Sequence, residues 1–171
     1  MKQFVVLLMT AAVLLMTGGC GYRFGTMGHP QIKTIAIAAV KNDSTTYNLS
    51  AIMRNILVEQ FMLDGTLKAV SEKKADCILY ARIVQVSSSE VTESSSSADR
   101  TFEPEEWRIK VVVEYSVIIP GQKAPLIPLR KVTGSADFQA PGDMDSATRR
   151  GAAQACRKAA EEMVEFTTEA W

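Results

Sequence analysis

The sequence predicts an α+β protein, a two-layer α/β sandwich in which two helices pack on one face of a mixed sheet of four to five strands. Three patterns lead to this prediction: apolar and polar residues alternate over 107–119, and apolar residues recur at helical spacing over 49–61 and 152–164. The expected order is strand, helix, four strands, helix. Elements with one apolar face pack in two layers, so the second face of the sheet should stay free.

The first segment has the pattern of a secretory leader. Lys2 precedes a short apolar run over 4–16, and the small residues 17–19 stand directly before Cys20. The run is too short to span a bilayer comfortably. Small residues before a cysteine resemble the bacterial lipobox, so we expect cleavage before Cys20 and acyl chains on it that hold the protein on a membrane. An ordinary secreted protein with an incidental cysteine is the alternative.

The chain therefore divides into a signal peptide over 1–19, a lipidated tether over 20–31 and a single domain over 32–171. After removal of the leader about 150 residues remain, enough for one domain with a real core. Charges balance, with 19 Lys and Arg residues against 19 Asp and Glu. A nucleic-acid partner would require a basic excess, so this class of function is excluded.

In the first half of the domain, the sequence predicts a strand over 32–40 and then a helix to about Leu63. Residues 45–48 offer candidates for the helix cap, and Gly65 should end the helix. The residues of its single apolar stripe are Leu49, Ile52, Met53, Ile56, Leu57 and Phe61. Two further strands are expected over 67–71 and 77–87, the second rich in β-branched and aromatic residues.

Residues 87–106 are rich in serine and acidic side chains, which predicts a long mobile loop. It is either a solvated connector or a segment that contacts a partner. The strand over 107–119 should then turn through 120–125 and return over 126–138 as a hairpin. A final helix follows, capped by Asp143 or Asp145 and ending near the last residue.

The sequence contains no set of residues typical of a catalytic or metal site. The only histidine, His29, lies on the tether, and no CxxC or Cys/His metal spacing occurs. Besides Cys20, the cysteines are Cys77 and Cys156, whose small apolar neighbours favour two buried thiols, although an oxidising compartment would permit a disulfide. We therefore expect neither enzymatic activity nor a cofactor.

The remaining polar signal is a set of basic residues around the hairpin and the loop that enters it. Such groups could bind the phosphates or carboxylates of an amphipathic ligand through charge-assisted hydrogen bonds. Alternatively, each pairs with an acidic neighbour across the strands; a hairpin turning near residue 122 places Lys131 roughly opposite Glu114. The candidate residues are Arg100, Arg108, Lys110, Arg130 and Lys131.

Several short segments, in this order, resemble the LptE family of lipopolysaccharide-assembly lipoproteins. The resemblance covers essentially the whole chain after the leader, and the order and spacing of the motifs carry it. An Ala-rich terminal helix follows the last of them. The segments are 20–24 (CGYRF), 35–37 (IAI), 41–45 (KNDST) and 117–121 (VIIPG).

The resemblance implies a lipoprotein on the periplasmic face of the outer membrane, a location that Gly21 after the anchor would also favour. It implies insertion into the lumen of the LptD barrel, where the protein plugs the channel, assists folding of the barrel and contacts lipopolysaccharide. In the family, a basic residue before the long strand and another on the returning arm of the hairpin are associated with this ligand. Arg100, and Arg130 or Lys131, are the nearest matches here.

Two other classes of protein remain open at this stage. The first strand and helix, with residues 42–45 between them, also resemble periplasmic lipoproteins of the curli-secretion and peptidoglycan-synthase-activator kinds. Such a protein would bind a synthase or form a secretion ring. A hydrolase whose site is assembled only in space is the third possibility.

Overall fold

The computed structural model describes residues 32–91, 106–139 and 142–169. The expected leader, the tether with Cys20, most of the serine-rich loop and Arg100 lie outside these ranges. The elements are β1 (Thr34–Ile37), β2 (Lys41–Asn42), α2 (Leu49–Asp64), β3 (Lys68–Ala69), the 3₁₀ helix η1 (Glu72–Lys74), β4 (Cys77–Glu90), β5 (Glu106–Ile118), β6 (Ile127–Gln139) and α3 (Met144–Glu169).

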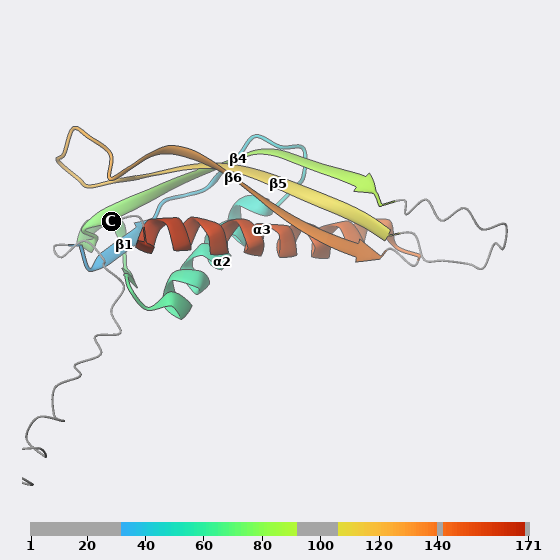
Figure 1. Cartoon of the computed structure of the whole chain (residues 1–171), viewed down its shortest axis with the longest axis horizontal. Helices are drawn as coiled ribbons and strands as arrows, with labels where there is room; N and C mark the ends of the chain where they lie inside the picture. The colour runs from blue at the N-terminus through green and yellow to red at the C-terminus, as the bar shows by residue number, and fades with distance from the viewer. Residues whose placement is uncertain (1–31, 92–105, 140–141, 170–171) are drawn as a thin grey trace, which may run out of the picture.

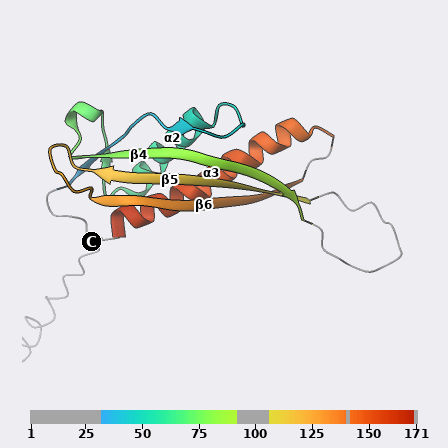
Figure 2. The same ribbon diagram turned by 90° about the horizontal axis from the view of Figure 1, so that it is seen from above.

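The strands form one mixed sheet in the order β3-β1-β4-β5-β6, with the short β2 also paired to β4. β1, β2 and β3 run parallel to their neighbours, whereas β4, β5 and β6 form an antiparallel meander. Figures 1 and 2 show α2 and α3 on the same side of this sheet. The predicted two-layer α+β architecture is therefore confirmed, with six strands in place of four or five.

The extra strand arises because the first extended segment is interrupted after Ile37 and then continues beyond the predicted end at residue 40. Ile37 pairs with Leu79 and Lys41 with Arg82, so four steps along the first segment correspond to three along β4. The additional residue breaks the regular ladder, and pairing resumes in β2. Hydrogen bonds from Ala38 N to Leu79 O and from Asp43 N to Ile83 O, 3.0 and 2.9 Å long, keep the whole segment against β4.

The predicted start of the loop at residue 87 is wrong. β4 continues to Glu90, and Ser87, Ser88 and Ser89 pair with β5. Composition misled the prediction because exposed serines carry no apolar signal. The ladder with β5 nevertheless satisfies the backbone hydrogen bonds of this segment.

The caps at the end of α2 and at the start of α3 follow the expected chemistry, and the cap at the start of α2 does not. Gly65 ends α2 with φ 73°, and its N–H donates to Phe61 O at 3.1 Å. Asp143 caps α3 by accepting from the backbone N–H groups of Asp145 and Ser146. At the start of α2, however, Asn48 has φ 63° and its side chain makes no capping hydrogen bond.

The core lies between the sheet and the two helices. From Ile109 onward, every second residue of β5 is fully buried on this side, namely Ile109, Val111, Val113, Tyr115 and Val117. The apolar stripe of α2 packs here as predicted, with only Ile52 partly exposed. Cys77 and Cys156 are free and buried, and burial raises the pKa of each thiol to about 12. Both cysteines therefore pack as small apolar residues.

Helix α3 lies unusually close to β6 because small residues face each other. A Cβ atom added to Gly134 would lie 1.9 Å from Ala155 O and 2.6 Å from Ala159 N. One added to Gly151 would lie 2.7 Å from the ring of Phe138. Only glycine fits at residue 134, since the atoms it would strike belong to the backbone of α3.

We predict that Gly134→Ala lowers the free energy of unfolding by about 3 kcal/mol, because the added methyl group must push α3 away from the sheet. Ser135→Ala, the matched control on the exposed side of the same strand, should stay within about 0.5 kcal/mol of the wild type. Urea unfolding followed by circular dichroism measures both. Equal stability of the two variants would contradict this account of the contact.

Candidate functional site on the free face

The sheet face opposite the helices, called the free face below, is covered by no helix of the described chain (Figure 1). Because side chains alternate along a strand, every second residue of β4, β5 and β6 points to this face. The register places these residues in rows that cross the three strands. Each row is an extended set of neighbours, and the rows differ in how their charges are balanced.

The first row joins Arg82, Glu114 and Lys131. Arg82 Nη2 lies 2.7 Å from Glu114 Oε2, and Lys131 Nζ lies 3.6 Å from Glu114 Oε1. Arg82 Nη1 also reaches Asp43 Oδ2 at 3.3 Å. The hydrogen bond from Arg82 lowers the pKa of the Glu114 carboxyl, so this group stays ionised at neutral pH. The predicted pairing of Lys131 with Glu114 is confirmed.

A second row holds Arg108, which is also paired with an acidic neighbour. Its Nε and Nη2 atoms donate to the two carboxylate oxygens of Asp137 at 2.6 and 2.8 Å. This two-bond contact lowers the pKa of Asp137. The charge of Arg108 is thus balanced within the sheet, and a ligand would have to compete with Asp137 for it.

The third row differs because Lys110 stands between two serines. Ser87 of β4 and Ser135 of β6 are its partners on either side, and all three side chains are exposed. Within the described ranges, Lys110 forms no ion pair with an acidic side chain. This row therefore presents an uncompensated positive charge flanked by two hydroxyl groups.

Arg130 does not belong to the free face. The regular register of β5 and β6 places Arg130 opposite the buried Tyr115, on the side of the helices. Its guanidinium lies over the ring of Phe166 of α3, with Cζ 4.2 Å from the ring centroid. Of the five candidate cations, the structure thus brings together Arg108, Lys110 and Lys131, places Arg130 apart and leaves Arg100 undescribed.

Beside the Arg82 row, the free face carries a shallow hollow of about 410 Å³. Two apolar side chains line it, Tyr80 with 44% and Leu129 with 71% of their surface exposed. Sequence analysis overlooked Tyr80 and Arg82, although they alternate with the buried Leu79, Ala81 and Ile83. That alternation was the available signal for a polar face on β4.

The described residues contain no cluster of three or more His, Cys, Asp and Glu side chains that could hold a metal ion. Neither described helix combines the length and the apolar character needed to cross a membrane.

The geometry defines a class of protein: a small two-layer α/β domain that buries one sheet face beneath its helices and presents a charged, hydroxyl-rich one. Solved structures share this fold. Protein XCC0632 from Xanthomonas campestris has a TM-score of 0.55 at 11% identity, covering 82% of this chain and 89% of that one. A minor lipoprotein from Acinetobacter baumannii has a TM-score of 0.51 at 8% identity, covering 80% of this chain and 93% of that one. The PelC dodecamer from Paraburkholderia phytofirmans has a TM-score of 0.50 at 11% identity, covering 80% of this chain and 88% of that one.

The model of the LptE family, described as lipopolysaccharide-assembly, matches residues 32–166. The chain therefore belongs to the LptE family, and its role lies in the assembly of lipopolysaccharide. No curated protein matches the chain.

Proposed function

We propose that this protein is an outer-membrane lipoprotein that plugs an LptD-type barrel, assists assembly of the barrel and takes part in delivering lipopolysaccharide to the outer leaflet. The observation that carries the proposal is the free face, which joins balanced ion pairs to Lys110, a cation that pairs with no acidic side chain of the described chain. Its work is fitting and positioning, without a chemical reaction or a cofactor.

The charge pattern of the free face suits contact with the inside of a barrel. The lumen of an outer-membrane barrel is polar, so a plug needs polar surfaces that can exchange hydrogen bonds with it. The pairs of Arg82 with Glu114 and of Arg108 with Asp137 provide such a surface. Both pairs lie on the free face, where they can form further hydrogen bonds. The close packing of α3 on β6 keeps this surface rigid.

Lipopolysaccharide carries phosphate groups, and Lys110 is the candidate best placed to bind one. Its ammonium group has no acidic partner in the described chain, and the hydroxyls of Ser87 and Ser135 stand beside it as further donors. Arg108 and Lys131 share the face but are already paired. Arg130, on the edge strand β6, and Arg100 remain candidates.

Anchoring completes the proposal. We propose that cleavage after residue 19 exposes Cys20, that acyl chains on Cys20 hold the protein on the periplasmic face of the outer membrane, and that residues 20–31 connect this anchor to the domain. Cys20→Ser should abolish incorporation of labelled palmitate while leaving expression detectable by immunoblot. Undiminished labelling of the variant would disprove the anchor.

The barrel is tested by photocrosslinking in cells with a benzophenone amino acid at Thr133, an exposed position on the free face. We expect a covalent adduct that mass spectrometry identifies as an LptD-type barrel. The same amino acid at Gln154, exposed on α3, is the matched control and should give a weaker adduct. Recovery of a peptidoglycan synthase, or of copies of this chain alone, would reject the barrel in favour of a synthase activator or a homo-ring.

The ligand is tested by capture of lipopolysaccharide on the immobilised full chain. Lys110→Ala should weaken capture about three- to tenfold, because an exposed charge-assisted contact is lost. Lys110→Arg should retain it, and Lys123→Ala, in the exposed turn before β6, is the charge-matched control. If Lys110→Ala and Lys123→Ala capture equally, the free face has only a structural role.

A further inference from the structure

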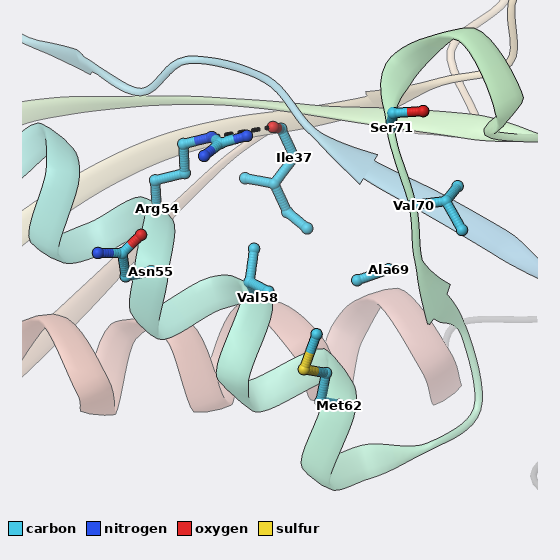
Figure 3. A pocket seen from close by; sticks show the side chains of 8 residues that line it. All are labelled: Ile37, Arg54, Asn55, Val58, Met62, Ala69, Val70 and Ser71. Carbon is cyan, nitrogen blue, oxygen red and sulfur yellow. Dashed lines mark hydrogen bonds between the residues drawn. The ribbon is translucent and has the colours of Figure 1, made fainter.

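A second hollow lies away from the free face, between α2 and the ends of β1 and β3. This groove, called the α2 groove below, has a volume of about 460 Å³. Figure 3 shows its walls, with α2 on one side and Ile37 and the segment leaving β3 on the other. Its size is within the range of small-ligand sites.

One end of the α2 groove is polar and positively charged. Arg54 Nε donates to the backbone oxygen of Ile37 at 3.3 Å, which fixes the guanidinium at the rim and leaves its terminal N–H groups available (Figure 3). Asn55 stands beside it, and none of the lining residues is acidic. In the described chain Arg54 forms no ion pair. This end is therefore suited to an anionic group.

The rest of the groove is apolar. Val58 and Met62 follow Arg54 along the same side of α2, and Ala69 faces them from the sheet edge, whereas the side chain of Val70 points away from α2 (Figure 3). From residue 54 to residue 62 the helix rises about 12 Å. Met62 exposes 66% of its surface, an unusual degree for a large apolar side chain lining a hollow. The groove thus changes from charged to apolar along its length.

We propose that the α2 groove binds a fatty acid, with its carboxylate on Arg54 and its acyl chain along Val58, Met62 and Ala69. A charged head followed by a flexible apolar chain matches the order of these residues, and Arg binds carboxylates through paired hydrogen bonds. An added peptide strand suits the site less well, because β3 offers only two paired residues. The inference goes beyond the proposed function and does not depend on the barrel.

The test uses the full chain in dioleoylphosphatidylcholine vesicles with a dodecanoate probe that carries a diazirine near its methyl end. After illumination, mass spectrometry should find the label on the segments that contain Met62 and Ala69. Arg54→Gln should reduce labelling at least about fivefold, because the contact with the carboxylate is lost. Unlabelled decanoate should compete about three- to tenfold less well than dodecanoate, since two methylenes are missing.

Controls separate this site from unspecific partition. Arg149→Gln removes an exposed arginine elsewhere and should leave labelling unchanged, and a dodecanol probe should be insensitive to Arg54→Gln. Met62→Ser, a change at an exposed position, should reduce labelling while circular dichroism shows an intact fold. Equal labelling of Arg54→Gln and wild type overturns the proposal. Labelling by a phosphatidylglycerol probe but not by dodecanoate also overturns it, in favour of a membrane lipid.

Discussion

The close contact of α3 with β6 is the constraint on which the rest of the structure depends. At Gly134 the helix backbone approaches the strand so closely that no side chain fits between them. The helix can do so because the residues it turns toward the sheet are small, chiefly Gly151, Ala152, Ala155 and Ala159. α2 then packs on both the sheet and α3, with an ion pair of 3.2 Å between Arg157 and Glu59 at the outer side of that contact. Both helices are thereby held on one face, and the other face remains available.

Much of the fold could be predicted because its signals are local and periodic. The alternation in β5 and the stripe on α2 follow from burial of one face, so they identify element type and core side together. The errors occur where pairing with a neighbouring strand determines the bounds of an element. Ser89 extends β4 because β5 lies beside it, and the one-residue offset between Ile37 and Lys41 becomes visible only against β4. Neither feature has a pattern in its own segment.

The candidate site was predictable in composition and only in part in arrangement. Lys131 lies opposite Glu114 because of the position of the turn, so counting residues from the turn along both strands is sufficient to predict this pair. Arg130 lies two residues before the buried Val132, so alternation along β6 already places it on the side of the helices. The isolation of Lys110 depends on its serine neighbours in two other strands, and only the assembled register reveals it. The sequence thus indicates which charges gather, and the sheet determines which of them are already neutralised.

The edge strand β6 affects whether the sheet can pair with other chains. β6 is its last strand, and a long unpaired strand would ordinarily recruit another chain and start aggregation. Near its start β6 contains Pro128, which has no N–H to donate to an added strand, and the charged Arg130 and Lys131 follow it. These residues discourage lateral growth of the sheet at this end. The sheet thereby carries its own protection against self-association along this edge.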